Sequence, residues 1–151
     1  MNELRTEPPR VPPDDSLSAK MSVLPRRDTK PEVALRRALH GRGLRFRVQV
    51  KVPGNGRRTI DIAFTRARLA VFVDGCFWHG CPDHHVPPKA NAEWWRWKVD
   101  LNRERDSDTD AKLGAAGWGV LRIWEHVHPE EGADLVATTY LARLADVERR
   151  R

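Results

Sequence analysis

The sequence predicts a single α/β domain in which helices flank a central mixed β-sheet. Segments with strand periodicity alternate along the 151-residue chain with segments of helical periodicity. Apolar residues make up 40% of the chain, which is enough to build one core at this length. The expected order of one helix, three strands, a helix, a strand and a closing helix is typical of a small α/β sandwich.

The N-terminal segment differs in composition from the rest of the chain. Residues 1–20 combine four prolines with charged side chains and few apolar ones, which predicts a disordered tail. Residues 21–151 are then expected to form the domain. No segment approaches the roughly 18 consecutive apolar residues of a membrane span, and the N-terminus lacks the apolar centre of a signal peptide. We therefore expect a cytoplasmic protein without membrane contact.

The chain is basic, with 27 Lys and Arg residues against 21 Asp and Glu residues and a formal net charge of +6. This balance favours a polyanionic partner such as nucleic acid. A well-solvated basic surface explains the same balance equally well, so charge alone leaves both interpretations open.

The first predicted helix has a clear N-terminal signal. Thr29, Pro31 and Glu32 have the pattern of a capping box with proline in the first turn, and two glycines end the helix after His40. The remaining elements follow from periodicity and from a turn at Pro53–Gly56. They are strands at 45–50, 59–64, 69–73 and 120–124, a helix from about 92 to 117, and a closing helix with Leu135, Leu141 and Leu144. The third strand is apolar on both faces and should be the most buried.

Two thiols and three imidazoles lie within eleven residues directly after the third predicted strand. Zinc prefers four tetrahedral nitrogen or sulfur ligands, and Cys76, Cys81 and His84 provide three of them from one loop. His126, just after the fourth strand, provides the fourth if the two strands are neighbours. His85 competes with His84 for the third position. The alternative is that the thiols are simply buried and the histidines lie on the surface.

Asp61 is an acidic residue inside a predicted strand. Period-two alternation directs its carboxylate away from both apolar neighbours, Ile60 and Ile62, so the carboxylate needs a partner. That partner is either a metal ion or an arginine or backbone amides, and the pattern leaves both open. Phosphodiester cleavage needs a cation and a base that deprotonates water. Asp61 would bind the cation and His79 would act as the base.

Three tryptophans follow one another closely at the start of the second predicted helix. Trp94, Trp95 and Trp97 cannot all face one core, because successive helical residues diverge by about 100°. Those left exposed beside arginine and lysine would form stacking platforms for bases. The alternative is that some of them cap the core.

The string from Phe72 to His79, with Asp61 upstream and Trp124-Glu125 downstream, resembles the very short patch repair mismatch endonucleases. The resemblance extends over roughly residues 21–127. It implies a restriction-endonuclease-like fold that binds and cleaves double-stranded DNA and has a structural zinc site.

The resemblance also implies residue roles. Asp61 and the backbone carbonyl of Val73 are expected to bind catalytic Mg²⁺, and His79 to activate the attacking water. Glu32 and Asp106 are expected to hold metal-bound waters or to orient His79. These four side chains would form the catalytic set.

Further residues are expected to contact DNA. The resemblance implies that Phe77, Trp78 and Trp95 enter from the major groove beside the mismatch, whereas Met21 wedges from the minor groove. A T·G wobble pair stacks less well than a matched pair, so intercalation itself would discriminate. The chain departs from the best-known members of the family at Asp74, where they carry a histidine, and Asp74 is a candidate for an additional metal ligand.

The function implied is hydrolysis of the phosphodiester 5′ of the thymine in T·G mismatches that arise from 5-methylcytosine deamination. Downstream mismatch-repair proteins would then excise and resynthesise the strand. A single nick requires one active site, so we expect a monomer. Two alternatives remain: a restriction or defence nuclease of the same fold that acts on matched or modified DNA, and a non-catalytic zinc module that binds distorted DNA.

Overall fold

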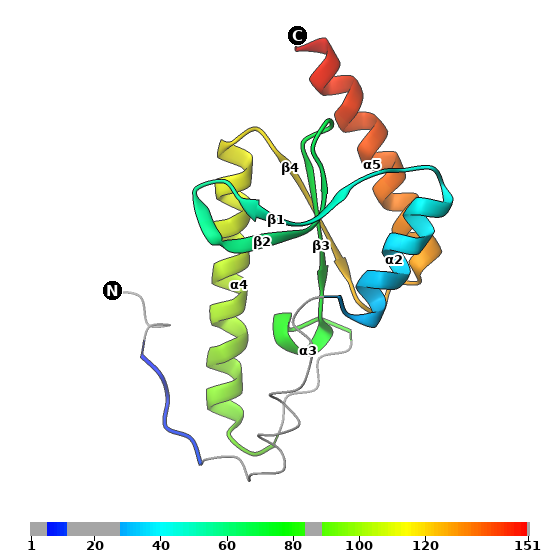
Figure 1. The fold of residues 1–151 in the computed structure, drawn as a ribbon. Helices are drawn as coiled ribbons and strands as arrows, with labels where there is room; N and C mark the ends of the chain where they lie inside the picture. The colour runs from blue at the N-terminus through cyan, green and yellow to red at the C-terminus, as the bar shows by residue number, and fades with distance from the viewer. Residues whose placement is uncertain (1–5, 12–27, 84–88, 151) are drawn as a thin grey trace.

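The computed structural model describes residues 6–11, 28–83 and 89–150, apart from the side chains of Phe77 and Trp78. In chain order the elements are α2 (Lys30–Gly41), β1 (Arg47–Val52), β2 (Asn55–Phe64), β3 (Leu69–Asp74), α3 (Cys76–His79), α4 (Ala92–Ala115), β4 (Gly119–Trp124) and α5 (Pro129–Arg149) (Figure 1). The four strands form one sheet in the order β1-β2-β3-β4. The pairs β1–β2 and β2–β3 are antiparallel, whereas β3 and β4 are parallel. The predicted mixed sheet with flanking helices is confirmed.

Helices cover both faces of the sheet. Figure 1 shows α4 on one side of the strands, and α2 and α5 on the other. The buried apolar residues form two clusters that correspond to these two faces. The cluster beside α2 and α5 contains Leu35, Leu39, Ile62, Phe64, Ala67, Leu69, Val71, Ile123, Ala133 and Val136. The cluster beside α4 contains Val52, Ile60, Ala63, Ala70, Phe72 and Leu113.

The first helix begins as the sequence predicts. The Thr29 hydroxyl accepts a hydrogen bond from the Glu32 amide at 3.4 Å, and Pro31 occupies the first turn. The helix ends at Gly41, one residue beyond the predicted end.

The hairpin between β1 and β2 is tighter than predicted. Its turn consists of Pro53 and Gly54 alone, and Asn55 is already paired with Val52. A φ of +82° at Gly54 allows the chain to reverse within two residues, which lets both strands extend. The predicted turn Pro53–Gly56 was therefore two residues too long.

The strand β3 is the most buried of the sheet, as predicted, with only Val73 partly exposed. Parallel pairing with β4 requires a crossover, and the 24-residue α4 provides it. Both strands consequently end at the same edge of the sheet. The short α3 follows β3 at this edge and was not predicted, because four residues are too few to show a helical period.

Part of the segment expected to be a disordered tail is among the described residues. Val11 exchanges two hydrogen bonds with the Asn91 side chain, at 2.8 and 2.9 Å. The Trp94 indole donates to Glu7 at 2.8 Å, and the Arg10 guanidinium lies 4.1 Å from the centre of the same indole. Residues 6–11 therefore lie against the N-terminal half of α4 (Figure 1).

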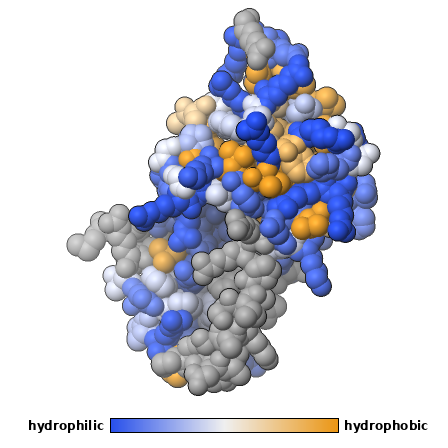
Figure 2. All heavy atoms as spheres, viewed as in Figure 1, coloured by the Kyte–Doolittle hydropathy of each residue, from blue (hydrophilic) through white to orange (hydrophobic). Residues whose placement is uncertain are grey.

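The surface in view is mainly hydrophilic. Figure 2 shows small, separate apolar areas among the described residues of this face. Among the described residues, the large apolar side chains that are exposed are Val11, Val48 of β1, and Leu135 and Leu141 of α5. Among the described helices, none combines the length and the apolar character needed to span a bilayer.

Candidate active site and metal centre

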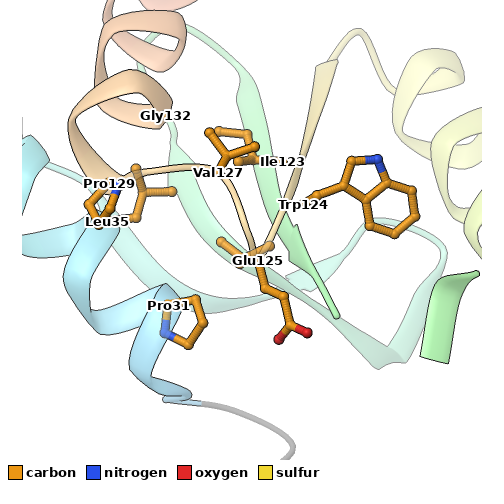
Figure 3. Close-up of a pocket in the computed structure, with 9 residues that line it drawn as sticks. Pro31, Leu35, Ile123, Trp124, Glu125, Val127, Pro129 and Gly132 are labelled. Atoms are coloured by element: carbon orange, nitrogen blue, oxygen red, sulfur yellow. The ribbon is translucent and has the colours of Figure 1, made fainter. Parts of the chain in front are cut away.

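The candidate site lies where β3 and β4 end. The Glu125 amide donates to the Asp74 carbonyl at 2.9 Å, and the Glu125 carboxylate accepts from the Cys76 amide at 3.0 Å. These two bonds join the ends of the parallel strands and the start of α3. Figure 3 shows Leu35 and Ile123 on the apolar side of a small neighbouring pocket, with the Glu125 carboxylate directed away from them.

Asp61 of β2 contacts β3 through its carboxylate, which accepts a hydrogen bond from the Val73 amide at 2.9 Å. The pKa of Asp61 is raised to about 7, chiefly by burial and in part by the nearby carboxylates of Glu32 and Asp74, against the lowering effects of the Val73 bond and the Arg122 charge. This carboxylate lies in surroundings that disfavour its negative charge. A bound cation would reverse that effect.

The strand around Asp61 departs from simple alternation. Ile60 packs in the cluster beside α4, whereas Ile62 packs in the cluster beside α2 and α5. The expectation that Asp61 points away from both neighbours is therefore wrong in detail. Gln49 lies opposite, between the pairs that β1 makes with Ile60 and Ile62, and has a φ of +52°. This irregularity in the neighbouring strand accompanies the change of face.

Glu32 is buried on the first turns of α2, with 3% of its surface exposed. Its Oε1 atom accepts from Arg36 at 2.7 Å and from the Gln49 side chain at 3.2 Å. Gln49 in turn accepts from the Thr59 hydroxyl at 2.9 Å. Glu32 is thus fixed between α2 and the sheet, and its charge acts on Asp61.

His79 at the end of α3 is bonded to Asp106 of α4, with 2.5 Å between Nδ1 and Oδ2. Burial alone would lower the pKa of His79. The bond to Asp106 and the charges of Asp74 and Asp106 outweigh burial and raise it above the ordinary value. Asp74, His79 and Asp106 each place a ligand atom within 4.8 Å of the others. The sequence-predicted partners His79 and Asp106 are therefore brought together.

Arg122 was missed by the sequence analysis. It lies on β4 between the partly buried Leu121 and the buried Ile123, and its guanidinium donates to the carboxylates of Asp74 and Asp110. A charged residue inside an otherwise apolar strand was the signal that could have identified it, because a charge at such a position needs partners. Its partner Asp110 lies on α4, and the packing of α4 against the sheet could not be predicted from the sequence.

Three of the four predicted zinc ligands converge. The His126 Nδ1 atom lies 3.2 Å from the Cys76 sulfur and 3.6 Å from the Cys81 sulfur. Burial raises the pKa of Cys76 to about 11, and the neighbouring Cys81 thiol raises it as well. Two thiols and an imidazole within 4.8 Å of one another fit the soft, tetrahedral preference of zinc. The remaining candidates, His84 and its competitor His85, lie outside the described residues.

The predicted DNA-contacting residues are described only in part. Met21 lies outside the described residues, and the side chains of Phe77 and Trp78 do as well. Trp95 is partly exposed and stacks edge-on against the buried Trp94, with 4.8 Å between ring centres. Trp97 is also partly exposed and lies against Trp94, with 5.9 Å between ring centres, so Trp94 is the buried one of the three. The use of the other two as platforms for bases stays a prediction.

Comparison with known proteins connects this site to a family. Residues 13–85 match the family described as DNA mismatch endonuclease Vsr. The chain is 47% identical over 122 residues to the type II nicking enzyme V.NaeI of Lentzea aerocolonigenes, covering 80% of this chain and 72% of that relative. It is 43% identical to the type II nicking enzyme V.XorIIP of Xanthomonas oryzae pv. oryzae, with 66% and 71% covered. It is also 37% identical to DNA mismatch endonuclease Vsr of Escherichia coli, with 72% and 68% covered.

Proposed function

Because the chain belongs to the DNA mismatch endonuclease Vsr family, we propose that this DNA endonuclease nicks duplex DNA on the 5′ side of the thymine in a T·G mismatch. The observation that carries the proposal is the position of Asp61, which bonds to the Val73 amide directly before Asp74, while Asp74 lies within 4.8 Å of the bonded His79 and Asp106. Hydrolysis of a phosphodiester needs charge compensation and a base, and these residues match the two requirements.

Magnesium is the cation we propose for Asp61, with the Val73 carbonyl as a second ligand. Magnesium prefers oxygen ligands, and the raised pKa of Asp61 supports a cation at this carboxylate. When bound, magnesium supplies positive charge that offsets the charge developing on the phosphate. Glu32 is held rigidly by Arg36 and Gln49, which suits an orienting role beside Asp61.

His79 is the base in this proposal. Its Nδ1 atom is engaged by Asp106, which leaves Nε2 to accept the proton of the attacking water. Asp106 then stabilises the imidazolium that forms, in agreement with the raised pKa of His79. Asp106 also fixes the orientation of the ring throughout.

We propose that zinc is structural. Cys76 begins α3, Cys81 follows it and His126 follows β4, so a zinc ion held by them and by His84 would tie the base-bearing helix to the end of β4. His79 would then be held in place in two ways, by its bond to Asp106 and by the zinc site that fixes α3.

Recognition of the T·G mismatch would use the aromatic side chains near α3 and the start of α4. We propose that Phe77, Trp78 and Trp95 insert beside the mismatch, with Met21 on the opposite groove. A wobble pair is easier to unstack than a matched pair, so insertion favours the mismatch.

The test is a nicking assay on end-labelled duplexes that differ only in carrying T·G, U·G or C·G at one position, with magnesium added or omitted. We expect magnesium-dependent cleavage of the thymine strand of the T·G duplex alone. Asp61→Asn and His79→Ala should each abolish cleavage and still bind the duplex. The matched controls His128→Asn and Glu131→Gln alter exposed residues away from the site and should cleave normally.

A second function is favoured by the names of several relatives, which describe type II nicking enzymes and mention no mismatch. Under this alternative the chain is a restriction or defence nuclease that acts on matched or modified DNA. Equal cleavage of all three duplexes would support it. Binding without cleavage, unchanged by Asp61→Ala, would instead indicate a non-catalytic zinc module.

A further inference from the structure

The Arg122 guanidinium is surrounded by carboxylates at the centre of the site. Its Nη1 atom lies 3.1 and 3.3 Å from the two carboxylate oxygens of Asp74. Its Nε and Nη2 atoms lie 3.0 and 2.7 Å from one oxygen of Asp110. The Phe72 ring flanks the group, with 4.3 Å between the guanidinium carbon and the ring centre. Contacts on several sides therefore fix the orientation of Arg122.

Arg122 also contacts the residue that holds His79. Its Nη2 atom is 3.4 Å from the Asp106 carbonyl, and its Nη1 atom is 3.6 Å from Asp106 Oδ1. The other carboxylate oxygen of Asp106, Oδ2, bonds to His79. Asp106 is thus held from one side by Arg122 while it orients the imidazole on the other.

The charges explain why such a group is needed. Asp74 and Asp106 bring carboxylate oxygens within 4.8 Å of each other and of His79, and only 7% of Asp74 is exposed. Two carboxylates this close repel each other unless a positive charge lies between them. Without Arg122, relief would come from a shift of one carboxylate or from uptake of a cation, and either change would disturb the Asp106–His79 bond.

We propose that Arg122 is a positioning residue of the nuclease site, which neutralises Asp74 and holds Asp106 against His79. This inference rests on the proposed function, since it acts through the proposed base. In this inference Arg122 is the charge partner of Asp74, and its guanidinium takes the place of the additional metal ion for which Asp74 was a candidate ligand.

The shape of the side chain matters as well as its charge. One planar guanidinium presents five donors and reaches Asp74, Asp106 and Asp110 at once. A lysine ammonium is a point charge and would satisfy one of these carboxylates at a time. Arg122→Lys is therefore expected to lose much of the effect, although it retains the charge.

The experiment compares Arg122→Gln and Arg122→Lys with a matched control, Arg58→Gln. Arg58 also joins the sheet to α4, through Asp108 and Thr109, but contacts neither Asp74 nor Asp106. Single-turnover nicking is measured with enzyme in excess, and DNA affinity is measured without magnesium. Both Arg122 variants should nick about 10–100-fold more slowly at unchanged affinity, the range typical of residues that support an active-site group from behind. Arg58→Gln should nick at nearly the wild-type rate.

A double-mutant cycle tests the route of action. If Arg122 acts through Asp106, Arg122→Gln adds little to the loss already caused by Asp106→Asn. A purely structural role would instead slow the double variant by the product of the two effects. Thermal unfolding shows whether each variant is folded, and Arg122→Lys provides a second variant should Arg122→Gln unfold.

Three results would overturn the inference: wild-type rates in both Arg122 variants, a loss no larger than that of Arg58→Gln, or a loss confined to DNA affinity. The comparison is run on whichever duplex the wild type cleaves, so failure of T·G specificity does not affect it. A wild-type protein that cleaves no DNA would overturn both the proposed function and the role of Arg122.

Discussion

The surroundings of Asp61 disfavour the ionised form of its carboxyl group. The group has an ordinary pKa of 3.8, and its pKa in the folded chain is about 7, chiefly because of burial and in part because of the charges of Glu32 and Asp74. Because the folded-state pKa is the higher one, folding favours the protonated carboxyl. The resulting stability is fully present below the ordinary pKa and is lost as the pH rises through about 7.

Without added divalent cation, the wild type should therefore become less stable between about pH 4 and pH 7, and Asp61→Asn should lose less stability over this range, because only the raised pKa values of Asp74 and His79 then contribute. Asparagine retains an acceptor for the Val73 amide and carries no charge. Magnesium should raise the melting temperature of the wild type at pH 8 and leave that of Asp61→Asn unchanged. Thermal unfolding across this pH range measures both effects.

The matched control for this prediction is Glu131→Gln, which removes an exposed carboxylate from α5. It should behave as the wild type does, both in the pH profile and in the response to magnesium. An Asp61→Asn variant that gains as much stability from magnesium as the wild type would place the cation elsewhere.

Among the elements, the junction of α3 with α4 is unusually close. Gly80 ends α3 with a φ of +66°, and a Cβ atom there would lie 2.7 Å from a Val99 methyl and 2.6 Å from the Arg103 guanidinium. Arg103 donates to the Gly80 carbonyl at 2.5 Å and to the His79 carbonyl at 3.2 Å. The backbone that carries the base is therefore held directly against α4.

Gly80→Ala should destabilise the fold by at least about 1–2 kcal/mol, because alanine is strained at positive φ and its methyl would meet Val99. It should also slow nicking, because α3 must move away from α4. Gly114→Ala is the control: this glycine lies in the last turn of α4 with open space around it, and alanine should be neutral or stabilising by up to about 1 kcal/mol. Urea unfolding that gave the two variants equal stability would contradict the close packing.

At the scale of the whole molecule, the proposed zinc ion joins segments that are far apart in the chain. Its candidate ligands Cys76 and Cys81 follow β3, and His126 follows β4, with α4 between them. A closed site of this kind adds its binding free energy to that of folding. Zinc should therefore matter for stability and, through the position of His79, for cleavage.

We expect about one zinc ion per wild-type chain, measured by elemental analysis, and less in His126→Asn. Chelation should lower the melting temperature of the wild type but scarcely change that of His126→Asn, which is already destabilised. The control is His128→Asn, two residues further on, where the side chain caps α5 and asparagine caps equally well. A zinc content that did not depend on His126 would exclude this ligand set.

Much of the whole-molecule architecture could be predicted from the sequence. The periodic segments were sufficient for the sheet and its helices, and the resemblance placed His79 with Asp106 before any geometry was available. Arg122 and Gln49 were missed for one reason. Each acts through partners on other elements, which only the packing of α2 and α4 brings near. The local sequence pattern does not predict contacts between residues on different elements.

The parallel pairing of β3 with β4 has a consequence during synthesis. A ribosome releases β2, α3 and α4 before Gly119–Trp124 exists, so the emerging chain carries Asp61, His79 and Asp106 without the strand that brings Arg122. A nascent nuclease of the proposed kind would thus lack a complete active site until β4 had been translated and had paired with β3.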